Sequence, residues 1–558
     1  MEAIQPKYLS LAQLFNGRLF RIPDYQRAYS WTSRQRSDLF GDISRTQQKG
    51  ADYGHFMATV VCLRRETQLL GTDQFDVLEV VDGQQRLTTL IILVNVVKVR
   101  LSKANKAEAK LAAELGELLV KPEADELLLL QTNHDSSHHF ANYLRTGKAP
   151  ASASAQTIAD RELLQAIEEC GAFVEAWQSA GETLSNLVAL LKNRLFFLLH
   201  EVNDEKIVYT VFEVLNSRGL EVAWLDRLKS ILMGSAFDLE NVNQSGIIDQ
   251  LHSTWRGIYS VIGLRQGLST EALRFAGTLR LAQIPSRPLS EEGSVATLRV
   301  ATTAKDINAV SAWLLSVTTA SDAVIANRRT DSVTRIAQAR LLAVAIKLRD
   351  DLRPAEKRAL LQRWEKVSFR IYGMLGNDAR TGVGDYVRLA WRIVNRDLPF
   401  ADIDGSIAKI GEDYPIQDAV EDGLREEDCY SDWQNELRYF MSRYEEFLAK
   451  KNNQKFSNEQ WEKIWMASAS RSIEHIWPQS KAPEKHKHRI GNLVLLPPGL
   501  NSKLQDKPAK EKAKEYRKTG LLIAGEVADA IEANGWNAKT IAQREEALLE
   551  WAKSEWAD

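Results

Sequence analysis

Long apolar runs are missing from this sequence of 558 residues. The longest, Leu90 to Val97, is interrupted by Asn95 and falls far short of the roughly 20 residues that cross a bilayer as a helix. The N-terminus, M-E-A-I-Q-P-K, lacks the charged leader and apolar core of a signal peptide. We therefore expect no membrane partner and no signal peptide.

Cysteine is scarce as well, and its three copies, Cys62, Cys170 and Cys429, lie far apart without metal-ligand spacing. Such a sparse, odd-numbered set is typical of reduced thiols, which predicts a cytoplasmic protein. Neither charge sign is in excess, because the formal net charge is −2. Any surface that binds DNA must therefore be a local patch. The segment G-x-x-x-x-G-K-[ST] is absent too, which excludes a P-loop as the nucleotide site.

The remaining composition, 44% apolar and 26% charged residues, is typical of a globular protein, and the length favours about two to four domains. Helical periodicity dominates residues 100–200 and 236–395, whereas strand patterns occur near the two ends. We therefore predict an α+β fold that is predominantly helical. A short amphipathic helix is expected within residues 1–20, and a linker over 396–416.

The most informative stretch covers residues 472–507 and contains S-I-E-H-I-W-P-Q-S, a basic spacer and R-I-G-N-L-V-L-L-P-P-G-L-N-S-K. The pattern predicts one strand that ends at W-P and a second strand over residues 493–496. The P-P-G turn then places Asn501 near the first turn of a basic helix. The expected order is strand, loop, strand and helix.

These residue types suit phosphodiester hydrolysis. The imidazole of His475 titrates near neutral pH, as a base that activates water should. Glu474 and Asn501 offer hard oxygen ligands, which suit Mg²⁺ or Mn²⁺ better than Zn²⁺. Neighbouring residues on a regular strand point to opposite faces, so Glu474 and His475 share a cleft only if the strand end is irregular. The alternative is an ordinary surface pair in a loop.

A second candidate site lies near the N-terminus. The segment R-I-P-D-Y-Q-R-A-Y-S-W, residues 21–31, is either an aromatic-capped loop or an anion-binding surface. Strand patterns at 55–63 and 75–81 precede D-G-Q-Q-R at 82–86, and a helix is expected to about Leu101. A strand, a glycine turn and a helix N-terminus form a natural anion site. In the alternative, Asp82 is only a helix N-cap.

The third segment, F-E-V-L-N-S-R-G-L-E-V-A-W-L-D-R-L-K, covers residues 212–229. Asp226 and Lys229 are three residues apart on an expected helix, so they share a face and form at least a local ion pair. His134, His138 and His139 lack a convincing carboxylate or cysteine partner, which favours surface histidines over a metal site. The cations between residues 335 and 363 fit a solvated helix face or a stripe that faces DNA.

The C-terminal stretch closely resembles the HNH nucleases, specifically the branch at the C-terminus of GmrSD-type modification-dependent restriction enzymes. The HNH domain of RNA-guided nucleases has a similar acid-His-Ile-x-Pro-Gln-Ser run, with Asp in place of Glu. It also has the nine-residue step between two asparagines that here separates Asn492 from Asn501. The resemblance implies a ββα-metal domain in which His475 is the general base and Glu474 and Asn501 hold the metal. It also implies that Asn492 orients His475 or the loop.

The N-terminal segments, in their order, look like the N-terminal domain of the same family, which resembles the ParB/sulfiredoxin-like fold. In the family this domain is credited with nucleotide hydrolysis that licenses cleavage. The resemblance therefore implies a nucleoside triphosphate as a cofactor and Asp82 as a catalytic residue. The implied nucleotide-binding residues are Arg21, Gln26, Arg27, Asp82, Gly83, Gln84, Gln85, Arg86, Asn216, Arg218 and Lys229.

These observations predict a nucleotide-regulated nuclease that cleaves modified double-stranded phage DNA, with Lys503 and Lys507 contacting the DNA backbone. One nuclease site per chain suggests a homodimer or two successive nicks for a double-strand cut. The predicted domains are residues 1–235 (ParB-like, with a helical insertion at about 100–195), 236–395 (helical coupling region) and 396–558 (HNH nuclease). The alternatives are a constitutive HNH nuclease or a nuclease toxin whose ParB-like domain only binds DNA.

Overall fold

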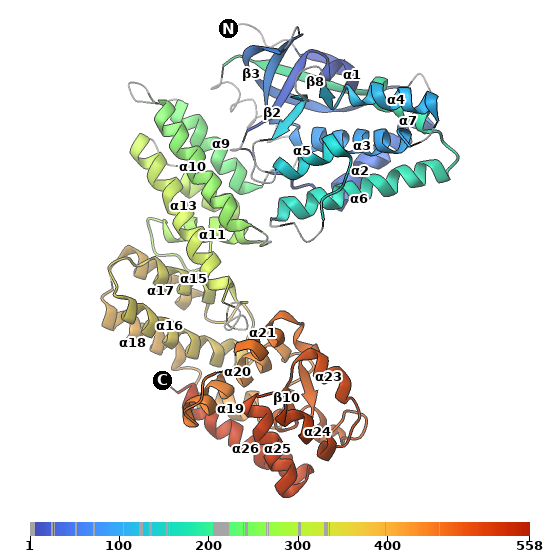
Figure 1. Cartoon of the computed structure of the whole chain (residues 1–558). Helices are drawn as coiled ribbons and strands as arrows, with labels where there is room; N and C mark the ends of the chain where they lie inside the picture. Colours follow the sequence, from blue (N-terminus) through green and yellow to red (C-terminus); the bar gives the residue numbers. More distant parts are fainter. Residues whose placement is uncertain are drawn as a thin grey trace. The chain divides into compact units, whose positions relative to one another are not determined.

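The computed structural model divides the chain into two compact units, Met1–Leu273 with Glu291–Thr318, and Arg274–Ser290 with Thr319–Asp558. It is predominantly helical with one mixed sheet, which confirms the predicted α+β class (Figure 1). The structure describes residues 6–557 except 24–25, 27, 51–52, 71–72, 104, 122–126, 133–136, 152–154, 156, 205–222, 238, 240–243, 264, 266, 300–302, 328–332, 334, 397 and 457. The predicted boundaries at residues 235 and 395 stay a prediction.

A six-stranded sheet, in the order β1-β8-β3-β4-β2-β7, organises the first unit. The central hairpin of β3 and β4 is antiparallel, whereas β8 runs parallel to β3 and β2 runs parallel to β4. β7 extends the sheet parallel to β2, and β1 closes the other edge antiparallel to β8. The strands are β1 (Lys7–Ser10), β2 (Arg18–Ile22), β3 (His55–Leu70), β4 (Asp73–Asp82), β7 (Leu130–Thr132) and β8 (Leu195–Val202).

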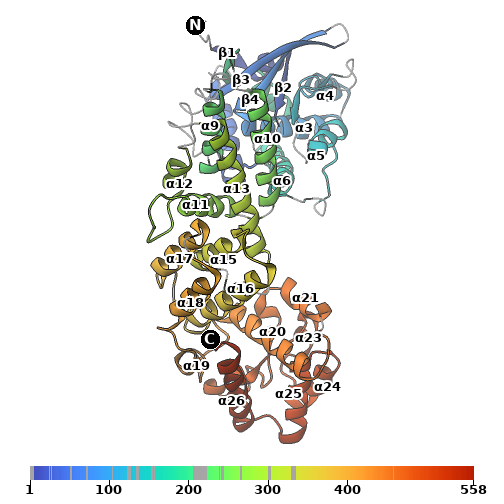
Figure 2. The ribbon, with the colours of Figure 1, turned by 90° about the vertical axis from the view of Figure 1, so that its left-hand side faces the viewer.

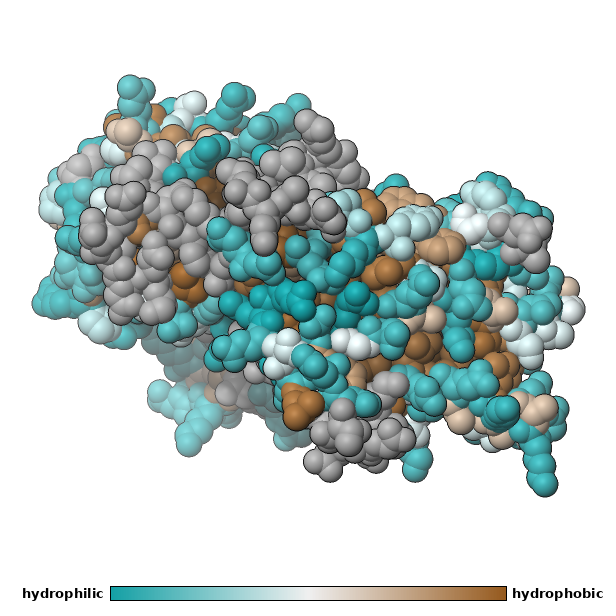
Figure 3. Space-filling model, turned by 90° about the horizontal axis from the view of Figure 1, so that it is seen from above, coloured by the Kyte–Doolittle hydropathy of each residue, from teal (hydrophilic) through white to brown (hydrophobic). Residues whose placement is uncertain are grey.

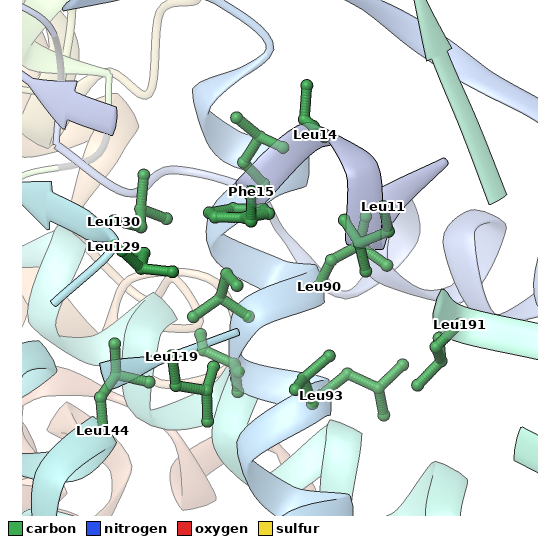
Figure 4. Packing of buried hydrophobic residues seen from close by; sticks show 14 of the residues in the cluster. Leu11, Leu14, Phe15, Leu90, Leu93, Leu119, Leu129, Leu130, Leu144 and Leu191 are labelled. Atoms are coloured by element: carbon green, nitrogen blue, oxygen red, sulfur yellow. The ribbon is translucent and has the colours of Figure 1, made fainter. Parts of the chain in front are cut away.

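Helix α3, Gln84–Leu101, lies at the centre of the helical layer on this sheet. It is buried along nearly its whole length because its residues are apolar on almost every side. Contacting helices are α4 (Lys106–Gly116), α6 (Ile158–Ser179) and α7 (Leu184–Asn193). Figure 4 shows Leu90 and Leu93 of α3 among side chains from α1, β7 and α7. The predicted strands before residue 82 and the helix after it are thus confirmed.

The short helix predicted within residues 1–20 is confirmed as α1 (Leu11–Phe15), which buries Leu11, Leu14 and Phe15, whereas the strands on either side of it were not predicted. β1 is followed by α1, Leu11–Phe15, which has only five residues, and then by β2. The side chain of Ser10 caps α1 by accepting a hydrogen bond from the Gln13 amide. Gly17 has a φ of 67°, which a glycine adopts freely and other residues rarely do. The chain therefore turns there into the sheet instead of continuing as a helix.

The helical prediction for residues 236–395 is confirmed in the described part, and α9 and α10 lie against each other in the first unit (Figure 2). Residues 280–290 separate α11 from α12. The helices are α9 (Trp224–Phe237), α10 (Gln244–Ile262), α11 (Leu268–Leu279), α12 (Glu291–Leu298), α13 (Ala304–Ile325), α15 (Ala337–Leu348), α16 (Pro354–Ser368) and α17 (Val383–Asn395), with a π-helical turn at Phe369–Met374.

The predicted linker over residues 396–416 is wrong, because α18, Phe400–Gly411, occupies most of it and buries Ile403 and Ile407. Two apolar residues four apart are enough to fix a short helix on a core. Some of the cationic side chains between residues 335 and 363 form ion pairs with acidic side chains. For these residues the ion pairs favour the solvated helix face over the stripe that faces DNA. The pairs are Arg349–Asp351, Arg353–Glu356 and Arg363–Asp404.

The C-terminal region contains the predicted order of strand, strand and helix. β9 (Ile473–His475) pairs antiparallel with β10 (Leu493–Leu495), and α23 (Pro498–Leu504) follows. The last helix, α26 (Ala538–Glu555), packs on the 3-10 turn at Ile490–Asn492. The other helices are α19 (Ile416–Gly423), α20 (Gln434–Lys451), α21 (Asn458–Met466), α22 (Glu484–Lys487), α24 (Ala509–Arg517) and α25 (Leu522–Asn534).

None of the helices in the described part of the chain is long and apolar enough to cross a membrane. The face drawn in Figure 3 carries mostly hydrophilic residues, with separate smaller apolar areas.

Candidate functional site

The strand pair β9–β10 carries His475 opposite Leu493 and Glu474 opposite Val494. The strand is regular up to His475, so the two side chains lie on opposite faces of the ladder. Their hydrogen-bond partners accordingly differ. The structure therefore separates the predicted base from the nearest predicted metal ligand, although the two residues are neighbours in sequence.

His475 is enclosed, with only 5% of the residue exposed. Its Nε2 atom lies 3.0 Å from Nδ1 of His488, and its Nδ1 atom lies 3.0 Å from Nε2 of Gln479. The ring of Tyr430 meets it edge-on, with a centroid separation of 4.7 Å. Burial, followed by the positive charges near it, lowers the pKa of His475 to about 3. The imidazole is therefore neutral at neutral pH, but in this environment it is a weaker proton acceptor than the predicted base that titrates near neutrality.

Glu474 faces a buried ammonium group. Lys512 of α24 places Nζ 2.5 Å from Oε1 of Glu474 and donates a hydrogen bond of 2.8 Å to the carbonyl of His475. The hydroxyl of Tyr516 donates to the same carboxylate oxygen at 3.3 Å. Burial raises the pKa of Glu474, and the attraction of Lys512 opposes that rise. Lys512 thus neutralises the charge that burial makes costly.

The two asparagines fix the backbone around the strand pair. Oδ1 of Asn492 accepts from the amide of Trp477 at 2.8 Å, and its Nδ2 donates to the carbonyls of Trp477 and Lys487. Asn492 was predicted to orient either His475 or the loop, and these contacts are with the backbone of the loop. Asn501 on α23 donates Nδ2 to the carbonyl of Ile473 at 3.1 Å, which joins the helix to β9.

The two predicted metal ligands carry the type of donor atom that a hard cation prefers. Glu474 and Asn501 both offer oxygen, and Asn501 uses its nitrogen for the backbone of β9. Mg²⁺ commonly takes only one or two protein carboxylates and keeps several waters. Among the residues that the structure describes, no group of three or more His, Cys, Asp or Glu side chains is arranged to hold a metal ion. A cation at Glu474 would share the carboxylate with Lys512.

The predicted DNA contacts, Lys503 and Lys507, are exposed at the end of α23 and just beyond it. Neighbouring turns are tied together there, because Ser480 donates to the carboxylate of Asp506 at 2.8 Å and Lys481 donates to its carbonyl. The side chains of both lysines are exposed, so they can contact the phosphate backbone of DNA.

The candidate anion site lies at the carboxyl ends of β2 and β4, which are neighbouring parallel strands of the sheet. Asp82 closes β4, and Gly83, with a φ of 93°, is the N-cap residue of α3. A Cβ atom at Gly83 would lie 3.3 Å from the carbonyl of Thr59. Oδ1 of Asp82 accepts from the Gly83 amide at 2.8 Å. The geometry is the predicted strand, glycine turn and helix N-terminus, with Gly83 rather than Asp82 as the N-cap.

Gln85 joins this turn to the first aromatic segment. Its Oε1 accepts from the Ser30 amide at 2.8 Å and its Nε2 donates to the Ala28 carbonyl at 3.2 Å. The guanidinium of Arg86 lies over the ring of Trp31, 5.5 Å from its centroid. Two of the segments singled out in the sequence therefore meet, and Gln85 is engaged with the backbone of the other one.

The other predicted nucleotide residues are placed differently. Arg21 donates to the amide oxygens of Gln131 and Gln68. Lys229 is buried on α9, with Nζ 5.3 Å from the centroid of the Tyr259 ring on α10. Gln26 lies in the loop after β2, where its amide donates to the Pro23 carbonyl. Gln84 is buried at the first turn of α3. Arg27, Asn216 and Arg218, and His134 of the histidine cluster, lie outside the described residues.

Sequence reasoning missed the side chains that surround the predicted base and acid. His488 and Gln479 were part of a loop, Tyr430 lies more than forty residues earlier, and Lys512 was one of many lysines in a basic segment. One signal for Lys512 was present: Lys512, Ala513 and Tyr516 lie on one helical face, and all three are buried.

Comparison with known families gives two matches. The model of the GmrSD restriction endonuclease N-terminal domain matches residues 11–233, and that of the C-terminal domain of GmrSD restriction endonucleases matches residues 414–551. Together they cover well over half of the chain, in the expected order. The chain belongs to the GmrSD restriction endonuclease family. A comparison with curated proteins gives no match.

Both candidate sites fall inside the matched ranges. The GmrSD N-terminal match contains the turn at Asp82 and Gly83, and the C-terminal match contains β9, β10 and α23. Membership in the GmrSD family makes the chain a restriction endonuclease whose substrate is DNA.

Proposed function

We propose that this GmrSD protein is a metal-dependent, nucleotide-regulated endonuclease that cleaves modified phage DNA. The observation that carries the proposal is the position of His475, a neutral histidine at the end of β9. The carbonyl of Ile473 on that strand is bonded to Asn501 of α23. A proton acceptor and a candidate metal ligand thus belong to one strand–strand–helix unit. The same arrangement supports the ββα-metal interpretation.

In this proposal His475 accepts the proton of the water that attacks phosphorus. Asn492 holds the backbone of Trp477, which keeps the loop after His475 in place. Lys503 and Lys507 contact phosphates beside the cleaved bond. A bound Mg²⁺ or Mn²⁺ ion at Glu474 and Asn501 would stabilise the negative charge that develops on the phosphate oxygens. For that ion and His475 to act on the same phosphate, the end of β9 must rearrange, because Glu474 faces Lys512 on the side of the ladder opposite to His475.

The ParB-like N-terminal domain holds the nucleoside triphosphate at the turn before α3. The positive end of the dipole of this 18-residue helix attracts phosphate. The side chain of Gln85 is occupied by the backbone of residues 28 and 30. We therefore assign Gln85 to holding the aromatic segment, and Gly83 and Arg86 to the anion.

Cleavage assays test both sites. Phage DNA carrying glucosylated or hydroxymethylated cytosine, phosphorothioate DNA and unmodified DNA are incubated with Mg²⁺ or Mn²⁺, with and without each nucleotide. The proposal expects cleavage of one modified substrate, loss of cleavage in His475→Ala, and normal cleavage in the control His55→Ala. Cleavage that survives in His475→Ala contradicts the assignment of the base.

The nucleotide effect is tested with Asp82→Ala and with Asp76→Ala, which changes the same residue type earlier on β4. We expect Asp82→Ala alone to lose the nucleotide effect while DNA binding persists. Cleavage of every DNA regardless of nucleotide would instead support a constitutive nuclease or a toxin.

A further inference from the structure

Aromatic side chains are exposed on the first unit, where β1, β8 and β3 are neighbours in the sheet. Tyr8 of β1 is 56% exposed, Phe56 of β3 is 51% exposed, and Tyr53, two residues before β3, is 37% exposed. Phe56 is the register partner of Phe196 on β8, so the two share a face of the sheet. The next residue on β8, Phe197, belongs to the core with α3, which places the aromatic residues on the face away from that core.

The rings of this aromatic patch (Tyr8, Tyr53, Phe56 and Phe196) are held in place from below. Tyr8 stacks on Phe196, with ring centroids 4.8 Å apart and an interplanar angle of 6°. A Cβ atom at Gly54 would lie 2.5 Å from the Phe196 ring, so that ring rests against the backbone of residue 54. Tyr8 is 56% exposed although Phe196 covers one face of its ring. The opposite face of the Tyr8 ring is therefore open to solvent.

Two cations lie at the rim of the aromatic patch. Nζ of Lys49 lies 4.3 Å from the centroid of the Tyr53 ring and donates to its hydroxyl at 3.2 Å. Arg194 donates to the carbonyl of Tyr53 at 2.9 Å. Within the described residues neither cation forms an ion pair with a carboxylate, whereas Asp42, the acid nearby, is paired with Arg45. The rim is thus positively charged, which matches a polyanion.

Open aromatic faces beside unpaired cations are the combination that binds single-stranded nucleic acid, because bases stack on the rings and phosphates meet the cations. We propose that the aromatic patch is a second DNA site, at which one unstacked base of the substrate lies on the ring of Tyr8 and Lys49 contacts a flanking phosphate. Bases inside a duplex cover each other, so the DNA must offer an unpaired or extruded base. This site goes beyond the proposed function, since it needs neither His475 nor a metal ion nor a nucleotide.

Binding of the full chain to fluorescent oligothymidine, followed by anisotropy without divalent ions or nucleotides, tests the stacking. We expect Tyr8→Ala to weaken binding by about 5- to 150-fold and Tyr8→Trp to retain it, because the indole keeps an aromatic face. Tyr8→Leu, which is apolar but not aromatic, should resemble Tyr8→Ala. Leu69→Ala is the control, because Leu69 is 71% exposed on β3 outside the aromatic patch and should bind like the wild type. Thermal unfolding verifies that each variant folds.

The charge at the rim is tested by salt titration. Lys49→Gln should make the slope of log Kd against log salt shallower by about 0.7, whereas Lys110→Gln on exposed α4 surface should leave it near the wild-type value. Photo-cross-linking of the wild-type chain to DNA that contains 5-iodouracil should give an adduct on Tyr8, which other DNA contacts of the chain cannot imitate.

Three results would overturn the proposal. The first is wild-type DNA binding by Tyr8→Leu, and the second is cross-linking confined to other regions. The third is a wild-type dimer that Tyr8→Ala dissociates without a change in DNA binding, because the aromatic patch would then join two copies of the chain. Loss of the proposed nuclease mechanism, seen as normal cleavage by His475→Ala, leaves each of these measurements unaffected.

Discussion

Removal of the Lys512 ammonium tests whether a buried ion pair holds β9 in place. Only 1% of the Lys512 side chain and 6% of the Glu474 side chain are exposed, and their charged atoms lie 2.5 Å apart. Loss of one partner leaves an uncompensated buried charge, which costs about 3–5 kcal/mol. We expect Lys512→Met to destabilise the strand pair by about this amount and to raise the pKa of Glu474 further, because the attraction that opposes burial is gone.

The double variant with Glu474→Gln isolates the charge effect. With both charges absent, the local unfolding free energy of β9 and α24 should lie within about 1–2 kcal/mol of the wild-type value. Replacing a buried ion pair by uncharged groups is often nearly neutral for stability. The two substitutions should therefore be strongly non-additive, as expected for residues in contact. Lys510→Met on the exposed face of the same helix is the control and should change stability by less than about 0.5 kcal/mol.

Hydrogen exchange followed by mass spectrometry is the suitable assay, because a chain with two compact units need not unfold in one transition. Peptides that cover β9 and α24 report the local opening free energy. The reasoning is refuted if Lys512→Met leaves the exchange of these peptides unchanged, or if the double variant is as unstable as the sum of the two single variants.

Three further predictions concern other parts of the chain. Gly83→Ala should destabilise the first unit by at least about 1 kcal/mol, because its φ is 93° and a Cβ atom would meet backbone; Gly171→Ala, in an open helical position, should not, and thermal unfolding compares them. Gln85→Ala should loosen residues 28–31 by about 1–3 kcal/mol by leaving two backbone groups without their partner, which exchange of that peptide measures; unchanged exchange would contradict the assigned role. The hydrogen bonds from Arg349 lower the pKa of Asp351 to about 2, so its stabilising contribution is complete above its unfolded pKa near 3.9 and is lost as the pH falls through the folded value. The difference in Tm between wild type and Asp351→Asn should therefore shrink between about pH 4 and pH 2, and a difference that does not depend on pH would rule this out.

Local pattern predicted the elements that carry the candidate sites. The strand before Asp82, the turn at Gly83 and the helix to Leu101 follow from alternation, a glycine and helical periodicity, which are properties of neighbouring residues. The strands around His475 and residues 493–495 were predicted on the same grounds. The short helix around Leu11 was predicted as well, but the strands that flank it were not, because they depend on pairing with β8 and β4, which are distant in sequence.

The sequence by itself determined the family, the order of the domains and the identity of the candidate base, His475, because short motifs hold those residues at fixed spacing. Tertiary structure alone decided which side chains meet it. Lys512 comes from a helix 37 residues after His475, and Tyr430 comes from a turn 45 residues before it. The pKa values of Glu474 and His475 depend on burial and on nearby charges such as that of Lys512, because these effects act through distances in space and not through separation along the chain.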